Sequence, residues 1–327
     1  MKGHQPTRHT LPDRIYLSLR AKARSEGRST DELLQLYALE GFLSRLADTP
    51  EAQRLVLKGG TLLAAFDARR PTRDIDLAGR ELASDALAIA QTVAAVAARP
   101  ANDGLMFDAG SPPARVIRDD NPYSGVRLTL VAHLASARMT IHIDVSVGDA
   151  VWPKPERIEL PRLLGGTLRL WGYPLPMVYA EKVLTMVQRG QANTRWRDFA
   201  DVFRLTRRYP IDGALLQASL RTVATYRQVS IEPLSGLLAG FAGVAGTDWA
   251  AWRRRQGLPE LPTSFSEVLD AVIAFSDPPL CGLVSAATWQ AGTGQWVEGP
   301  ARSAAPDSAP PSVRSRPHRP TPGGAGQ

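Results

Sequence analysis

Leu57-Lys58-Gly59-Gly60-Thr61 and Asp74-Ile75-Asp76-Leu77 are the two most informative segments of the 327-residue sequence. The first predicts a short strand that ends in two glycines, and glycine lets backbone N–H groups approach a phosphate closely. The second predicts a strand on which Asp74 and Asp76 point to the same face, because side chains alternate along a strand. Such a pair of carboxylates can hold Mg²⁺, a hard ion that takes oxygen ligands and bridges to substrate phosphates.

A third carboxylate, Asp144, lies in a segment that alternates cleanly between apolar and polar residues from Met139 to Val147. We expect a strand there, with Asp144 and His142 on its polar face. Three carboxylates can hold two metal ions, which would activate an attacking oxygen and stabilise a leaving one. Arg70 and Arg73 flank the aspartate pair and could neutralise triphosphate charge. An Asp-x-Asp pair alone is usually two exposed strand residues, so the prediction rests on the combination; His142 fits a hydrogen-bonded sheet residue equally well.

The composition limits the kind of protein. Thirty-nine Lys and Arg against 32 Asp and Glu give a net charge of +7, and 44% hydrophobic residues suffice for a core. No apolar run approaches the roughly 20 residues that span a bilayer, and the polar N-terminus lacks the apolar region of a secretory signal. Cys281 is the only cysteine, so we expect a cytoplasmic protein without an internal disulfide.

Periodicity predicts an α/β chain in four parts: a helical segment over 1–50, a core over 51–150, a mostly helical lobe over 151–297 and a disordered tail over 298–327. Ser29 and Glu32 have the spacing of a capping box, and residues 81–98 read as a helix. Gly190 is expected to stop a helix, with Asn193 or Thr194 capping the next. The tail is rich in Pro, Ala, Ser and Gly and includes Arg302, Arg314, Arg316 and Arg319.

The order of these motifs resembles the polymerase-β-like nucleotidyltransferase superfold, whose signature is Gly-Gly or Gly-Ser, a gap, and Asp-apolar-Asp. More narrowly, it resembles the AbiEii/AbiGii toxin family, the nucleotidyltransferases of bacterial type IV toxin–antitoxin and abortive-infection systems. The resemblance extends from about residue 30 to residue 255 and rests on residues 57–62, 70–77, 143–149, 180–182 and 193–201. It implies an α+β core with a mixed sheet, followed by the helical lobe.

The resemblance also implies roles for individual residues. Asp74, Asp76 and Asp144 would be metal ligands, and Lys182 and Asp198 would act in the site from the second lobe. The nucleoside triphosphate (NTP) would lie against Lys58, Gly59, Gly60, Thr61, Thr72 and Arg73. Thr61 stands where many such enzymes have serine, which leaves the phosphate contacts open. Thr72 occupies a Ser/Thr position that the antitoxin phosphorylates in some members.

Several of these residues have simpler interpretations. A helix lysine such as Lys182 is usually solvated. Asp198 and Asp201 lie one turn apart, and either could be an acid stabilised by the helix dipole; we favour Asp198 as the site residue and Asp201 as structural, paired with Arg197. Asp149 follows a strand and is consistent with a turn residue.

We therefore expect a Mg²⁺-dependent nucleotidyltransferase toxin that moves NMP from an NTP to RNA, the tRNA 3′ end being one candidate, with an antitoxin encoded nearby. The tail holds four arginines and two acids, so most of the positive excess lies in the folded part, which favours a polyanionic acceptor. Two alternatives stay open: nucleotidylation of a protein hydroxyl, and a non-catalytic module that binds RNA or a partner.

Overall fold

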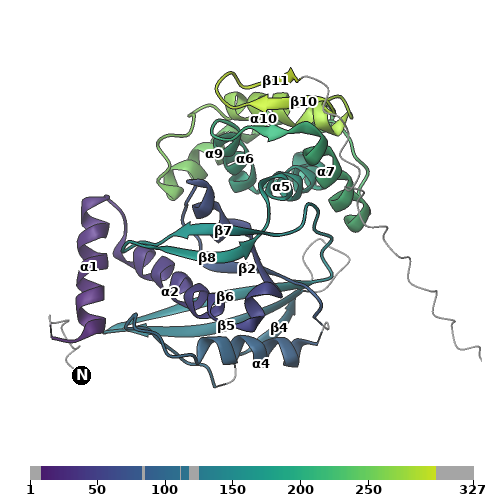
Figure 1. Ribbon diagram of the computed structural model, residues 1–327. Coiled ribbons are helices and arrows are strands. Elements are labelled where there is room, and N and C mark those ends of the chain that lie inside the picture. Colours follow the sequence, from purple (N-terminus) through teal and green to yellow (C-terminus); the bar gives the residue numbers. More distant parts are fainter. Residues whose placement is uncertain (1–8, 83–84, 111, 118–124, 300–327) are drawn as a thin grey trace, which may run out of the picture.

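The computed structural model describes residues 9–82, 85–110, 112–117 and 125–299. Within them the chain forms two lobes, one built around a large sheet and one mostly helical (Figure 1). Nearly all of the tail predicted over 298–327 lies outside the described residues. No helix in the described ranges is both long and apolar enough to cross a membrane.

The large sheet is mixed, as predicted. Its strands run in the order β3-β5-β6-β2-β1-β8-β7, and β4 pairs with β5. The β2–β6 and β1–β8 pairs are parallel and the others are antiparallel. The strand bounds are β1 Leu55–Lys58, β2 Asp74–Gly79, β3 Met106–Phe107, β4 Ala114–Ile117, β5 Gly125–Leu134, β6 Ala137–Val147, β7 Glu156–Pro161 and β8 Thr167–Gly172.

The sequence prediction placed the boundary between the lobes at residue 150, and so assigned β7 and β8 to the second lobe. Strand β8 pairs in parallel with β1, so the hairpin belongs to the large sheet. The helical lobe begins only with α5, at Leu175. The pairing joins strands more than 100 residues apart, and periodicity reports only which face of a strand is buried, not its neighbour.

Three helices accompany the sheet: α1 Leu11–Ser25, α2 Thr30–Ala47 and α4 Ala86–Ala97. Helix α2 packs against β6 and β8, while α4 packs against α2, β4 and β5. The short elements η1 Pro50–Gln53, α3 Gly59–Leu62 and η2 Leu63–Phe66 surround β1. Together the helices bury the apolar face of the sheet, on which Ile75, Ile143 and Val145 are fully buried.

One predicted helix start is confirmed without its capping box, and another is corrected. Ser29 is the N-cap of α2, but its side chain makes no cap hydrogen bond, and the Glu32 side chain pairs with Arg28. Helix α4 begins at Ala86 with Asp85 as its cap, rather than at Glu81. Glu81 has φ +53°, a left-handed conformation that does not continue into a helix.

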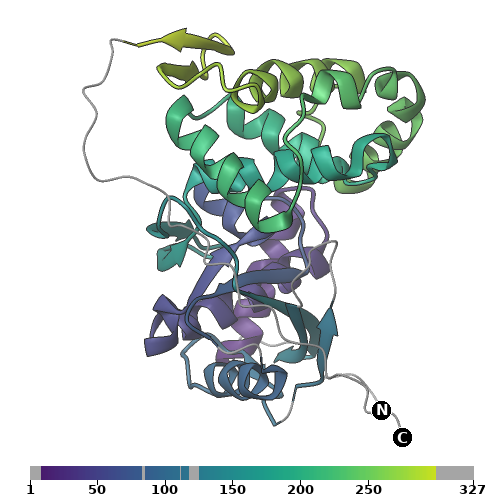
Figure 2. The same ribbon diagram turned by 90° about the vertical axis from the view of Figure 1, so that its right-hand side faces the viewer.

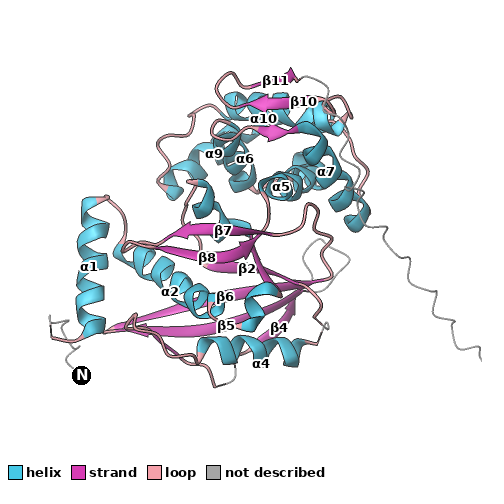
Figure 3. Ribbon diagram, in the orientation of Figure 1, coloured by secondary structure: helices cyan, strands magenta, loops and turns pink. Residues whose placement is uncertain are grey.

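The second lobe contains α5 Leu175–Arg189, η3 Gly190–Ala192, α6 Trp196–Thr206, α7 Gly213–Arg227, α8 Leu234–Leu237, α9 Phe241–Gln256 and α10 Phe265–Leu280. A small sheet that the periodicity did not predict covers its outer end (Figure 3). It consists of β9 Ile211–Asp212, β10 Ala287–Gln290 and β11 Gln295–Glu298. Trp289 and Trp296 hold it to the helices by packing against Phe275.

Gly190 ends α5, as predicted. The N-cap of α6 is Arg195, not Asn193 or Thr194. Asn193 nevertheless shapes this junction, because its buried side-chain oxygen accepts a hydrogen bond from the Arg195 N–H at 2.8 Å. Trp196 and Phe199 of α6 pack against Phe241 and Phe265, which anchors the start of α6 against α9 and α10.

Ile143→Ala tests how much the buried apolar face of β6 contributes to stability. Ile143 is fully buried beside Asp144, so removing its side chain should lower the free energy of unfolding by about 2–4 kcal/mol. Thr140→Ala on the exposed side of the same strand should change it by about 0.5 kcal/mol or less. Urea denaturation measures both, and equal effects would contradict the assignment of faces.

Candidate active site

Four charged residues form one row across the strands of the large sheet. The backbone pairing places Lys58 of β1 beside Asp76 of β2, Asp76 beside Asp144 of β6, and Asp144 beside Arg127 of β5. Cross-strand partners point to the same face of a sheet. Asp74 joins this face because it lies two residues before Asp76. The three carboxylates predicted from the sequence are therefore brought together, with a cation at each end of the row.

This face of the sheet looks toward the helical lobe across a cavity of about 630 Å³. Figure 2 shows the helical lobe seated over the sheet from a second direction. Eight cationic and five acidic side chains line the cavity, so it suits an anionic ligand despite its carboxylates. They are Lys58, Arg70, Arg127, Lys182, Arg189, Arg195, Arg197 and Arg227, with Asp74, Asp76, Asp144, Glu181 and Asp198.

Gly59 makes the junction between β1 and the carboxylates possible. Its φ is +66°, and a Cβ built on it would lie 2.0 Å from Oδ2 of Asp76. Glycine is therefore required twice here, by the backbone conformation and by the close approach of the carboxylate. Gly60 lies beside Arg70 and Thr72, so the double-glycine turn forms part of the cavity wall.

The carboxylates repel one another in the sheet. Burial raises the pKa of Asp76, and the neighbouring charges of Asp144 and Asp74 raise it further against the opposing effect of Lys58. Asp144 receives two hydrogen bonds from Arg127, at 2.8 and 2.6 Å. Within the described ranges, no hydrogen bond or ion pair joins the carboxylates of Asp74 and Asp76 to any side chain.

This donor set fits a hard divalent cation, because crowded carboxylate oxygens in a half-buried site gain most from such an ion. In the part of the chain that the structure describes, no three His, Cys, Asp or Glu side chains stand together as a finished metal site. Asp144 is engaged by Arg127 instead. The carboxylate set thus fits a divalent cation, although Arg127 is paired with one of its three members.

Asp149 is a buried hub, not the turn residue that the sequence suggested. It accepts hydrogen bonds from Lys58, from Ser146 at 2.6 Å, from Tyr173 at 3.1 Å and from Tyr226 at 3.3 Å. Burial alone would raise its pKa, but the Lys58 charge together with the hydrogen bonds from Lys58, Ser146 and Tyr173 lowers it. Asp149 thereby orients Lys58 and connects it to α7 of the second lobe, through a contact over 77 residues that no local pattern reveals.

The wall formed by the helical lobe is a network of buried ion pairs. Lys182 of α5 contacts Asp198 at 3.1 Å and Asp201 at 2.6 Å, both on α6. Arg70 reaches Asp201 from the sheet lobe at 3.0 Å, and Arg195 contacts Asp198 at 2.6 Å. Burial would raise the pKa of Asp198, but Lys182 and Arg195 hold it well below its usual range.

The structure separates the roles of the two aspartates. Asp198 lines the cavity, whereas Asp201 is fully buried behind it. The predicted pairing of Asp201 with Arg197 is replaced by pairs with Arg70 and Lys182, because Asp201 points into the lobe interface. Lys182 is a buried cavity residue rather than a solvated one.

Of the remaining residues expected in the site, one lines the cavity and three do not. Thr72 lines the cavity next to Asp74. Thr61 does not; its hydroxyl donates to the Asp74 carbonyl at 2.9 Å and so holds β2 in place. Arg73 is exposed and lies outside the cavity lining, because neighbouring residues on an extended chain point to opposite sides. His142 is hydrogen-bonded to Thr129 and does not line the cavity.

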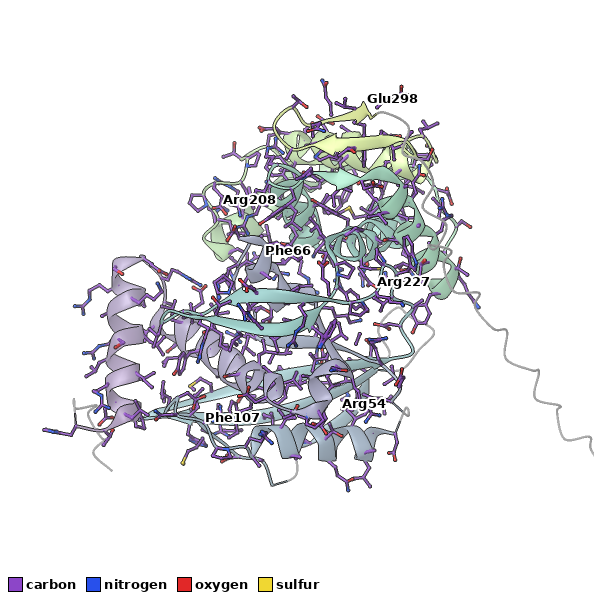
Figure 4. All side chains as sticks on the ribbon, viewed as in Figure 1. Arg54, Phe66, Phe107, Arg208, Arg227 and Glu298 are labelled. Atoms are coloured by element: carbon purple, nitrogen blue, oxygen red, sulfur yellow. The ribbon has the colours of Figure 1, made fainter. Side chains whose placement is uncertain are left out.

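Five cavity cations were missed in the sequence: Arg127, Arg189, Arg195, Arg197 and Arg227. Arg195 and Arg197 could have been predicted, because they lie next to the expected site residue Asp198 in the sequence. Arg127 could have been found by pairing the two alternating strands in register, whereas nothing local marks Arg227. Figure 4 labels Arg227 where the helical lobe faces the sheet, and it pairs there with Glu181.

Comparison with known proteins gives one family match. A family model described as "Nucleotidyl transferase AbiEii toxin, Type IV TA system" matches residues 41–271. A solved structure of a candidate nucleotidyltransferase from H. pylori is 14% identical, with a TM-score of 0.43, and the match covers 79% of this chain and 96% of that one. JHP933 from Helicobacter pylori is 13% identical, with a TM-score of 0.33 and coverage of 70% and 96%. No curated protein matches the chain.

Asp201→Ala tests the buried network. The substitution leaves Arg70 and Lys182 without their shared carboxylate, so the free energy of unfolding should fall by about 3–5 kcal/mol. Glu159→Ala is the matched control, because its pair with Arg169 is exposed and is worth about 1 kcal/mol or less. Denaturant unfolding compares them, and equal small losses would contradict a structural role for Asp201.

Proposed function

The chain belongs to the AbiEii nucleotidyltransferase toxin family of type IV toxin–antitoxin systems, and from this premise we propose that it transfers NMP from an NTP to an RNA hydroxyl. One observation carries the proposal: three carboxylates on the sheet wall and five cations on the helical wall line one cavity. A polyphosphate between these walls is held by the cations, while its reacting end meets the carboxylates. A module that only binds RNA has no need of three crowded acids.

The nucleotide is bound by residues of both lobes. Lys58, oriented by Asp149, and the Gly59–Gly60 turn contact its phosphates from the sheet lobe. Lys182 contacts them from α5, since its ammonium group has three donors and the aspartates use two. Arg195 and Arg197 add charge at the start of α6. These groups hold the α-phosphate in line for attack and neutralise the pyrophosphate that leaves.

Asp74, Asp76 and Asp144 would hold Mg²⁺, with room in the donor set for two ions. A bound metal supplies Lewis-acid activation of the acceptor hydroxyl and charge neutralisation on the leaving pyrophosphate. The oxygen of the acceptor forms a bond to the α-phosphorus, and the bond from that phosphorus to the β-phosphate oxygen breaks. The residues of this chain contribute by position and charge rather than by a covalent intermediate.

The acceptor proposal rests on the remaining cations of the cavity. Arg189 and Arg227 also line the helical wall of the cavity, where Arg227 pairs with Glu181. RNA ends are recognised through shape and phosphate contacts, which such residues provide without a sequence motif. The tRNA 3′ end is one acceptor that fits this description.

Regulation by an antitoxin follows from membership of the family. Thr72 lines the cavity, and its Oγ1 lies 3.4 Å from the Asp74 amide nitrogen. A phosphate on Thr72 would place a dianion beside the metal carboxylates and repel the nucleotide. We propose Thr72 as the position at which a partner kinase would silence the site.

Asp76→Asn tests the reaction. The substitution keeps the shape of a buried residue but removes a metal-binding charge, so transfer of labelled NMP should fall by roughly 10²-fold or more. Asp108→Asn on the exposed side of the same lobe should retain full transfer. Each of the four labelled NTPs is supplied with total RNA, and unchanged circular dichroism controls for folding. Full activity of Asp76→Asn would contradict the proposed site.

The acceptor is tested by digestion of the labelled product. The protein is incubated with labelled NTP and a bacterial lysate, and the product is divided between RNase and protease. Label that RNase releases and protease leaves intact supports RNA as the acceptor. Label that survives RNase and is lost to protease would overturn the RNA proposal in favour of a protein hydroxyl.

A further inference from the structure

Arg127 forms a bidentate ion pair with Asp144. Its Nε donates to one carboxylate oxygen at 2.8 Å and its terminal nitrogen to the other at 2.6 Å. The two residues are direct cross-strand partners in the β5–β6 pair, so their backbones hold them opposite each other. The Asp144 side chain is 14% exposed and that of Arg127 is 40% exposed. The arginine thus covers the carboxylate from the solvent side.

The same guanidinium lies in the field of the other two carboxylates. The hydrogen bond to Asp144 raises the pKa of Arg127, and the charges of Asp74 and Asp76 raise it further. Arg127 is therefore the fixed cation that balances the acids at this end of the row. It lines the cavity, as the carboxylates do, and a divalent ion would seek the same oxygens.

Arg127 occupies one lone pair on each oxygen of Asp144 and holds its positive charge beside both, so a metal ion that binds this carboxylate must displace or repel the guanidinium. The cost of losing a charge-assisted bidentate pair is then subtracted from the binding of the metal. Asp74 and Asp76 carry no such competitor among the described side chains. Asp144 is thus less available to a metal ion than Asp74 and Asp76 are.

We propose that Arg127 competes with the divalent metal ion for Asp144 and so sets the affinity of the carboxylate site. The inference rests on the metal-dependent reaction proposed above. Without metal the arginine offsets part of the negative charge of the three carboxylates; with metal it gives up Asp144 to the ion. Free metal ions then bind more weakly than three unpaired carboxylates would bind them.

The test measures Mn²⁺ binding to the full chain by electron paramagnetic resonance of the free ion, with no nucleotide and no turnover. Arg127→Gln should bind Mn²⁺ roughly tenfold more tightly than the wild type, as expected for loss of one charge-assisted pair. Arg127→Lys should lie between them. Arg197→Gln removes a charge from the same cavity without touching Asp144, and should change affinity by about twofold or less.

A double-mutant comparison isolates the contact. In an Asp144→Asn background, Arg127→Gln should tighten Mn²⁺ binding by about twofold or less, because the shared ligand is gone and only the loss of a nearby charge is left. Mn²⁺ should also raise the melting temperature of Arg127→Gln more than that of the wild type. Equal affinity of wild type and Arg127→Gln, or equal effects of Arg127→Gln and Arg197→Gln, would overturn the competition and leave the proposed reaction standing. Absence of Mn²⁺ binding in every variant would overturn both.

Discussion

Strand β2 lies between β1 and β6, and its register places Lys58, Asp76 and Asp144 side by side in the sheet. A shift by one residue would turn Asp74 and Asp76 into the apolar layer and Ile75 toward the cavity. The buried side of β2 prevents this, because Ile75 and Leu77 have no exposed surface. The hydrophobic core therefore positions the acids from the opposite face of the sheet.

The second lobe is held to this row by charge rather than by apolar packing alone. Arg70 crosses from the sheet lobe to Asp201, which also holds Lys182. Buried ion pairs of this kind add little net stability, but each fixes the geometry of its partners, because an unpaired buried charge is costly. The cavity is thus enclosed by walls whose relative position depends on one aspartate that does not reach the cavity itself.

Much of the fold and half of the site could be predicted from local pattern. Alternation along β6 identified the face of Asp144, the glycine pair marked the end of β1, and Gly190 marked the end of α5. The misses share a cause. Arg127, Asp149 and the β7–β8 hairpin act through partners far along the chain, and periodicity carries no information about which distant segment becomes a neighbour.

Spacing and local conformation, which are readable in the amino-acid sequence, establish which face of a strand each acid occupies and where the chain turns. The cation that each acid meets depends on the folded chain: Arg127 for Asp144, Lys58 for Asp149, and Arg70 with Lys182 for Asp201. The physical reason is that burial makes an unpaired charge expensive, so partners are selected by the packing of whole elements, which local sequence does not encode.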